Sequence, residues 1–195
     1  WKDYRKIFLD ERRIAQGREF LQTYKVPLAR AEQQFGVPAN IIAAIIGVET
    51  RYGHHKGKHR VLDALATLAF DYPPRSTFFT SELEQYLLLV KEQGFKAEEL
   101  MGSYAGAMGF GQFISSSYRH YSVDFDGDDV ADIINNPIDA IGSVANYFNK
   151  HGWQAGEAVT VTARINDKTN RMLANQALKP TLSLQDLATG GYQAD

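Results

Sequence analysis

Glu49 follows a run of apolar residues, Ile41 to Val48, near the end of a predicted helix. A carboxyl group in this position is partly desolvated, and desolvation disfavours the anion and raises the pKa. The negative end of the helix dipole acts in the same direction. An acid that protonates a glycosidic oxygen needs a raised pKa, because it must keep its proton near neutral pH. Taken alone, the pattern is more often a glutamate that turns to solvent, since glutamate is rarely buried.

A second group of residues that could do chemistry is acidic. Asp124, Asp126 and Asp128 have the spacing of the oxygen ligands at positions 1, 3 and 5 of an EF-hand calcium loop. Asp129 stands at position 6, where an EF-hand has glycine, and Asn135 stands at position 12, where it has glutamate. Two interpretations are open, a divalent cation site and a solvated acidic turn that is satisfied by its own backbone.

Three histidines lie close together at His54, His55 and His59. Their neighbours are basic, and these are Lys56, Lys58 and Arg60. A transition-metal site is the alternative, but no acidic partner lies nearby in the sequence. We interpret the segment as a solvated basic loop, which would also attract an anionic polymer.

The elements that must position these residues are mostly helical. Periodicity and apolar runs predict helices at residues 4–24, 28–35, 41–48, 61–70, 81–91 and 137–150. Gly36 ends the second helix, Pro38 suits a first helical turn, and Ser81 with Glu84 forms a predicted capping box. Because residues 41–48 are apolar almost all round, we expect that helix to be buried.

Two further segments have a distinct character. Residues 105–111 are mostly small, which lets backbones or ligands approach closely. Residues 159–165 alternate apolar and polar side chains, which predicts a strand. We therefore predict a mainly α protein with a helical region over residues 1–152, which includes the acidic loop 124–139. Residues 153–195 would begin a small β subdomain at the C-terminal end.

The composition is that of an ordinary globular protein. The chain has 195 residues, of which 44% are hydrophobic and 23% are charged. A net charge of −2 gives no sign of a nucleic-acid partner, and the absence of cysteine excludes disulfides and thiolate sites. No stretch approaches the roughly 20 apolar residues of a membrane span, and no signal peptide begins the chain. We interpret the chain as a processed form whose export signal or anchor would lie upstream.

Five blocks of the sequence resemble one family, the lytic murein transglycosylases of the membrane-bound B type and their soluble relatives. The blocks are GVETRYG (47–53), RVLDALATL (60–68), DYPPR (71–75), GSYAGAMGFGQF (102–113) and DAIGSVANYF (139–148). The resemblance covers about residues 1–155. A chance match to one block is conceivable, but a chance match to all of them in this order is not.

The resemblance implies a lysozyme-like helical fold in which Glu49 is the single catalytic residue. This glutamate would protonate the oxygen between N-acetylmuramic acid and N-acetylglucosamine in peptidoglycan. It would then act as a base toward the 6-hydroxyl of the muramic acid, which attacks the anomeric carbon and leaves a 1,6-anhydro end. Other glycosidases pair two carboxyl groups. Asp63 and Asp71 are the other candidates, and we regard both as structural.

The resemblance also implies a set of substrate contacts. Ser103 and Gln112 match positions near the acid, and Tyr147 matches a tyrosine close to it. Tyr4 matches an aromatic residue of the groove. Arg75 matches an arginine that would pair with a lactyl or stem-peptide carboxylate. Without the resemblance, each of these residues would be interpreted as a cap, a surface residue or the edge of the core.

Some members of the family carry a calcium loop that is longer than the standard EF-hand. The implied ligands are Asp124, Asp126, Asp128, the carbonyl of Val130 and Asp139. The calcium ion would be structural, because it neutralises clustered carboxylates and folds the loop. Catalysis itself would need no cofactor.

The resemblance also leads to expectations about the C-terminal segment, the partners and the cellular location. Family members carry a later tyrosine–asparagine element that completes the cleft, and no matching stretch precedes Asp195. Either the chain is shortened or its closing residues differ. The implied partner is the glycan strand of peptidoglycan, with other cell-wall enzymes as a further class. The implied location is the periplasm or the outer membrane of a Gram-negative bacterium, with membrane contact only through an anchor outside this chain.

Two other functions fit the same residues. A hydrolase of lysozyme type would also use a glutamate at a helix end, although it would normally need a second carboxylate. A non-catalytic wall-binding or calcium-binding module would not need Glu49 at all.

Overall fold

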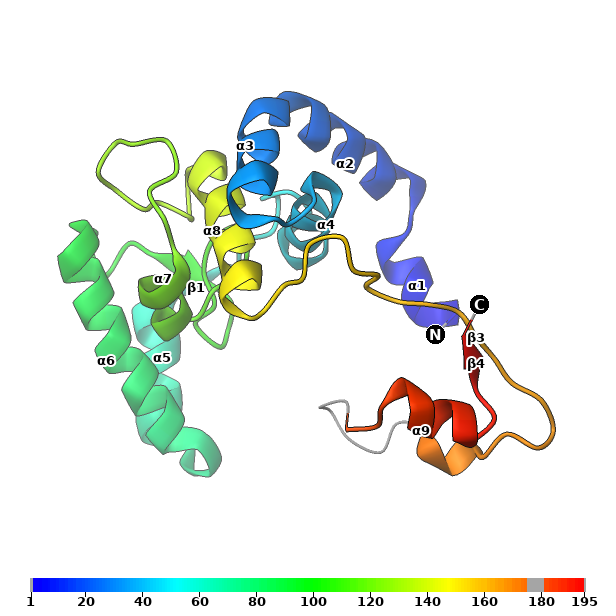
Figure 1. Cartoon of the computed structure of the whole chain (residues 1–195). Coiled ribbons are helices and arrows are strands. Elements are labelled where there is room, and N and C mark those ends of the chain that lie inside the picture. The colour runs from blue at the N-terminus through cyan, green and yellow to red at the C-terminus, as the bar shows by residue number, and fades with distance from the viewer. Residues whose placement is uncertain (1, 175–180, 195) are drawn as a thin grey trace. The chain divides into compact units, whose positions relative to one another are not determined.

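The structure is a computed structural model that describes residues 2–174 and 181–194. The chain divides into two compact units, Trp1–Ala155 and Gly156–Asp195 (Figure 1). Unit 1 is helical. Its helices are α1 (Lys2–Phe8), α2 (Glu11–Thr23), α3 (Lys25–Phe35), α4 (Ala39–Thr50), α5 (Val61–Asp71), α6 (Ser76–Gln93), α7 (Ser115–Tyr121) and α8 (Pro137–Lys150), with the 3-10 helix η1 (Pro73–Arg75).

Both units contain a short antiparallel strand pair. In unit 1, β1 (His59–Arg60) pairs with β2 (Met101–Gly102). In unit 2, β3 (Ala163–Arg164) pairs with β4 (Gln193–Ala194), and the 3-10 helix η2 (Arg171–Leu173) and α9 (Leu184–Thr189) lie between them in the chain. The predicted mainly α fold with a small β element is therefore confirmed.

The core of unit 1 is formed by helices that are neighbours in the sequence, such as α5 and α6, and by helices that are distant in it, such as α3 and α8. Helix α5 packs along α6, α7 packs on α6, and α8 packs on α3 and α4 (Figure 1). Ile42 and Ile46 of α4 and Ile141 of α8 are fully buried. Burial of each such side chain contributes about 1.5–3 kcal/mol. The hydroxyl of the buried Tyr118 donates to the carbonyl of Ala131 at 2.8 Å, so this polar atom is satisfied in the core.

The predicted helix over residues 4–24 is wrong, because two helices occupy this range. Helix α1 ends at Phe8, and Asp10 caps α2 by accepting a hydrogen bond from the Arg13 backbone N–H at 2.8 Å. The predicted capping box at Ser81 is also wrong. Helix α6 begins at Ser76, directly after η1, and Ser81 lies inside the helix. Phe79, which precedes Ser81, is buried and extends the apolar face in the N-terminal direction.

Two other elements differ from the prediction in extent. Pro38 is the N-cap of α4 and lies just outside its first turn. In the predicted strand at residues 159–165, only Ala163 and Arg164 form a strand, and the side chains of the range are exposed. Apolar and polar residues therefore alternate in this segment, although neither of its faces is buried.

Helix α4 is not buried on all sides, although its residues are apolar almost all round. Ile42, Ala43 and Ile46 face the core, whereas Ala44 is exposed and Val48 is 48% exposed. An apolar surface thus remains uncovered on the part of the helix that carries Glu49.

The segment after β2 folds back beside it. Gly102 forms a bridge with Met108, and Met108 forms a bridge with Phe113, so β1, β2, Met108 and Phe113 lie in successive rows. Gly109 adopts a φ of 72° in this segment, and a Cβ atom there would lie 2.4 Å from the carbonyl oxygen of Ile133. Close backbone packing thus requires glycine at this position.

Gly109→Ala will destabilise the protein more than Gly94→Ala. Gly94 has nearly the same φ, 70°, but no atom lies within 4 Å of the added Cβ, so this variant isolates the conformational cost of about 1–2 kcal/mol. Gly109→Ala carries that cost and a backbone clash, and we expect at least about 2 kcal/mol more, as for an overpacked core. Urea unfolding of both variants measures the difference. Equal losses would contradict the packing role of Gly109.

Candidate active site

A cavity of about 340 Å³ lies beside the C-terminal end of α4. Its walls come from α4, from the loop before α7, from α7 and from α8. The lining residues are Ile45, Glu49, Gly111, Gln112, Phe113, Ile114, Ser117, Val144, Tyr147 and Phe148. Glu49 is the only acidic residue among these lining residues. We name this space the Glu49 cavity.

The environment of Glu49 favours the protonated carboxyl. Part of its side chain is exposed, but burial raises the pKa of the carboxyl above its ordinary value. Across the described parts of the chain, no hydrogen bond or ion pair holds the carboxylate and opposes this shift. Glu49 therefore has the property of a general acid without a fixed cationic partner.

Thr50, the neighbour of Glu49, connects the end of α4 to the loop that carries Phe110 and Gln112. Thr50 is 1% exposed, and its hydroxyl lies 2.9 Å from the carbonyl oxygen of Phe110 and 3.1 Å from that of Ile46. The hydroxyl oxygen of Thr50 also accepts a hydrogen bond from the backbone N–H of Gly53 at 3.0 Å. These contacts fix the helix end, the following turn and the loop that leads to Gln112.

The turn after Glu49 is held by a tyrosine that inserts between two helices. Arg51 and Tyr52 both have positive φ, and the Tyr52 hydroxyl packs against Gly17 of α2 and Gly47 of α4. A Cβ atom at Gly17 or Gly47 would lie 2.4 or 2.5 Å from that hydroxyl. In the block GVETRYG, Gly47 thus makes room for the side chain of Tyr52.

Gln112 lies in the Glu49 cavity, in a loop that fixes its side chain. Its φ is 50°, and its Nε2 donates to the carbonyl of Gly109 at 3.0 Å and to that of Lys56 at 3.4 Å. The amide carbonyl oxygen of Gln112 accepts no hydrogen bond within residues 2–174 and 181–194, so it is available to a ligand hydroxyl or amide.

Tyr147 also lies in the Glu49 cavity, on the face of α8. Its ring stacks on His151 with centroids 4.0 Å apart, and it contacts Tyr121 and Phe113 at 5.1 and 5.6 Å. The structure thus brings Gln112 and Tyr147 together with Glu49. Their roles toward a substrate stay predictions.

The other three predicted substrate residues do not line the Glu49 cavity. The Ser103 hydroxyl accepts hydrogen bonds from the backbone of Ala107 at 3.0 Å and of Ala105, and thereby shapes the 103–107 turn. Arg75 is exposed, and its guanidinium lies over the ring of Phe78 at 4.1 Å. Tyr4 lies on α1, where it contacts Phe8 at 5.0 Å. Substrate contact by these residues stays a prediction.

Several cavity residues were not predicted from the sequence. They are Ile45, Gly111, Phe113, Ile114, Ser117, Val144 and Phe148. Ser117 is the polar side chain among them, and it lies in the first turn of α7. The position of Ser117 shortly after the block 102–113 is the one sequence signal that could have indicated a site residue. The apolar lining residues resemble ordinary core residues in the sequence.

The acidic loop brings four carboxylates together. Asp124, Asp126, Asp128 and Asp139 each place one oxygen within 4.8 Å of the others. Asp139 is fully buried, and its two oxygens accept backbone hydrogen bonds from Phe125 at 2.7 Å and from Asp132 at 2.8 Å. Burial raises the pKa of Asp139, although these hydrogen bonds oppose the shift. None of the ion pairs between described residues involves the four aspartates.

The turn of this loop is made without glycine at position 6. Asp129 has a φ of 70°, which is the conformation that an EF-hand obtains from glycine and that aspartate tolerates. Asp124 holds the turn by accepting backbone hydrogen bonds from Gly127, Asp128 and Asp129 at 2.7, 3.2 and 2.8 Å. The oxygen donor set suits a hard cation such as Ca²⁺. The carbonyl of Val130 as a ligand stays a prediction.

Comparison with known proteins gives the family. The sequence matches the family described as Transglycosylase SLT domain over residues 1–195. The chain belongs to this family. It is 51% identical over 163 residues to Membrane-bound lytic murein transglycosylase B of Escherichia coli K12, which covers 84% of this chain and 45% of that protein. The predicted family is therefore confirmed.

Solved structures support the same relationship. Soluble lytic transglycosylase SltB1 from Pseudomonas aeruginosa has a TM-score of 0.95 at 51% identity, over 98% of this chain and 64% of that chain. Escherichia coli Slt35 in complex with calcium has a TM-score of 0.90 at 45% identity, over 100% and 61%. SltB3 from P. aeruginosa in complex with NAG-NAM-pentapeptide has a TM-score of 0.87 at 35% identity, over 98% and 50%. The chain thus spans about half to two thirds of the length of these relatives.

Glu49→Gln will stabilise the folded protein at neutral pH. The pKa of Glu49 is raised on folding, so the stability that its proton contributes is fully present below about 4.5 and is lost as the pH rises through the raised pKa. Glutamine stays neutral and avoids that loss. Urea unfolding at pH 7 and pH 4 should show a gain for Glu49→Gln at pH 7 that diminishes at pH 4. Glu19→Gln, on the exposed surface of α2, is the control. A gain of the same size at both pH values would argue against desolvation of Glu49.

Proposed function

We propose that this protein is a lytic transglycosylase that cleaves the β-1,4 bond between N-acetylmuramic acid and N-acetylglucosamine in peptidoglycan. The observation that carries the proposal is a single carboxyl with a raised pKa, Glu49, in a cavity whose lining residues include no second acid. A hydrolase of the two-carboxylate type needs a partner at about 5–10 Å, and no cavity residue could supply it. The names of the relatives agree with this activity.

The reaction follows from one group that acts twice. Glu49 donates its proton to the glycosidic oxygen, and the bond from that oxygen to the anomeric carbon of the muramic acid breaks. The 6-hydroxyl oxygen of the same sugar forms a new bond to the anomeric carbon, and its proton passes to Glu49. The carboxyl is thereby regenerated and no water is consumed. The attacking hydroxyl has a high effective concentration because it belongs to the sugar already bound.

The other cavity residues would orient the sugar. The free carbonyl oxygen of Gln112 can accept a hydrogen bond from an N-acetyl N–H or a hydroxyl group. The rings of Tyr147 and Phe113 offer an apolar wall to a sugar face. Ile45 extends this apolar surface along α4. Glu49 thus faces a surface that excludes water from part of the reacting bond.

The location and partners follow from the substrate. Peptidoglycan lies in the periplasm of Gram-negative bacteria, and the E. coli relative is named as membrane-bound. Within the described residues, no helix is long and apolar enough to cross a bilayer. We propose action in the periplasm or at the outer membrane, with the glycan strand as the partner and with other cell-wall enzymes as a further class.

We also propose that the acidic loop holds a structural calcium ion. Asp124, Asp126, Asp128 and Asp139 would bind it, with the carbonyl of Val130 as a fifth ligand. The ion would neutralise four clustered carboxylates and supply no catalytic chemistry. The calcium complex of Slt35 supports this proposal.

Glu49→Gln should lower kcat on peptidoglycan by at least about 100-fold, because the swap keeps the shape and removes the proton. Binding of glycan strands should survive in this variant, and Glu19→Gln should retain full activity. Mass spectrometry of the wild-type digest should show 1,6-anhydromuramic acid ends. Reducing ends would indicate a hydrolase instead, and full turnover by Glu49→Gln would point to a role other than catalysis.

Calcium should raise the melting temperature of the wild-type protein by several degrees over the value in EGTA. At 100 times the dissociation constant, binding adds about 2.7 kcal/mol. Asp126→Asn should lose most of this rise. The Asp126 carboxylate accepts a hydrogen bond from the Asn136 side chain at 2.7 Å, whereas Asp124 accepts the backbone hydrogen bonds of the turn, so the replacement leaves the turn intact. Asp71→Asn, on α5, is the control. The metal site would be refuted by equal melting temperatures with calcium and with EGTA.

A further inference from the structure

A second cavity of about 480 Å³ lies on unit 1 and shares no lining residue with the Glu49 cavity. The segment around β1, one face of α5 and the turn after β2 form its walls. The lining residues are Lys58, His59, Arg60, Asp63, Ala64, Thr67, Leu68, Met101 and Tyr104. We name it the Lys58 cavity. Neither the catalytic residues nor the acidic loop contribute to it.

The charge of the Lys58 cavity is positive. Asp63 is its one acid, and the Arg60 guanidinium pairs with the Asp63 carboxylate, with both Nε and Nη2 at 2.7 Å. Lys58 makes no ion pair or hydrogen bond with any residue that the structure describes. One cation is therefore left without a counter-charge beside a concave surface, and this arrangement attracts an anionic group.

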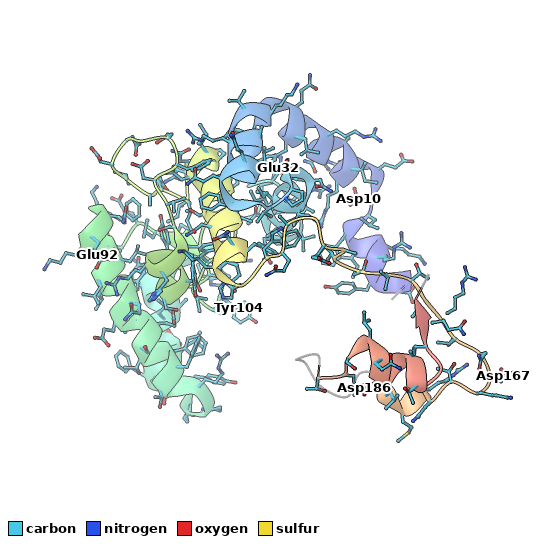
Figure 2. The ribbon with its side chains drawn as sticks, in the orientation of Figure 1. Asp10, Glu32, Glu92, Tyr104, Asp167 and Asp186 are labelled. Atoms are coloured by element: carbon cyan, nitrogen blue, oxygen red, sulfur yellow. The ribbon has the colours of Figure 1, made fainter. Side chains whose placement is uncertain are left out.

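The rim of the Lys58 cavity is aromatic and apolar. Tyr104 is 75% exposed and Met101 is 41% exposed. Tyr104 lies at the edge of unit 1 in the view of Figure 2, and its hydroxyl has no partner among the described residues. An exposed tyrosine of this kind contributes little to folding but offers a large contact area to a ligand. The surface thus suits an anionic group on an organic body better than it suits a free inorganic ion.

The two cavities lie at opposite ends of one small ladder. Arg60 of β1 and Met101 of β2 line the Lys58 cavity, whereas Phe113, two rows beyond β2, lines the Glu49 cavity. Adjacent rows of a sheet are about 4.8 Å apart, which places β2 about 10 Å from the Phe113 row. An extended peptide branch of about three residues, at about 3.3–3.6 Å per residue, can span this distance from a strand bound at Glu49.

We propose that the Lys58 cavity binds a free carboxylate of the peptide stem that the glycan strand carries. This inference rests on the proposed function, because it assigns a second contact to the same substrate. The lactyl carboxylate of the muramic acid is consumed in the amide bond to the stem, so the carboxylates of a peptide-bearing strand lie on the peptide. Lys58 pairs with the carboxylate, and Tyr104 and Met101 pack on the adjoining side chains.

The test compares the kinetics of two variants and one control variant on two substrates. Lys58→Gln removes the charge, Tyr104→Ala removes the rim, and Lys91→Gln removes an exposed charge on α6 as the matched control. The substrates are strands with intact peptides and strands from which the peptides have been removed. On peptide-bearing strands, Lys58→Gln and Tyr104→Ala should each raise KM about 10-fold at unchanged kcat, which is the loss of one charge-assisted or aromatic contact. On peptide-free strands, both variants should match the wild type and Lys91→Gln.

Three results would overturn the proposal. Equal losses on both substrates would make the cavity a subsite for the glycan itself. A loss on peptide-free strands alone would assign it to the exposed lactyl carboxylate. Unchanged KM on peptide-bearing strands would leave the stem without a contact there.

A direct binding measurement separates this proposal from the proposed function. The tetrapeptide released from the strands is titrated into Glu49→Gln protein, and the ring signals of Tyr104 are followed by NMR. We expect saturable shifts that Lys58→Gln weakens about 10-fold and that salt diminishes. If the wild type cleaves neither substrate but the tetrapeptide still binds in this way, the catalytic proposal fails and the peptide site stands. No shift at Tyr104 would refute the peptide site whatever the catalytic result.

Discussion

The hydrogen bond between the Thr50 hydroxyl and the carbonyl of Phe110 joins the two parts of the site that the rest of the structure serves. On one side is the end of α4, which carries Glu49, and on the other is the loop that carries Gln112. Loss of this contact would leave the Phe110 carbonyl without the Thr50 hydroxyl, and a buried acceptor without a partner costs about 1–3 kcal/mol. The separation of acid and loop is thereby set by covalent geometry and one buried contact.

Much of the fold and the position of Glu49 near the end of α4 could be predicted from the sequence, because both depend on local patterns. Helix α8 has the predicted bounds, Pro137 to Lys150, and α3 ends before Gly36 as expected. Glu49 was placed by its apolar run and by the block that surrounds it. The start of α6 was missed because a serine with a glutamate three residues later imitates a cap wherever it occurs. Only the burial of Phe79 in the core shows that α6 begins before Ser81.

The walls of the site could not be predicted in the same way, because they are set by tertiary packing. Ser117 and Phe148 belong to α7 and α8 and meet Glu49 only after these helices dock. The exposure of Val48 could not be predicted for the same reason. The composition of a helix shows how apolar it is, but it does not show which face lacks a packing partner. Asp129 shows that a residue that departs from a motif can still adopt the backbone that the motif needs.

The backbone of Ile133 and Ile134 has a consequence for how the molecule opens. The Phe110 N–H donates to the Ile133 carbonyl at 3.1 Å, and the Lys56 ammonium donates to the Ile134 carbonyl at 2.6 Å. Two residues within the acidic segment therefore accept hydrogen bonds from the loop that carries Gln112 and from Lys56. Local opening of the acidic segment would expose the Phe110 amide to solvent exchange at the same time, so the two loops form one cooperative unit in native-state fluctuations. Order in the loop that carries Gln112 is in this sense shared with the acidic segment.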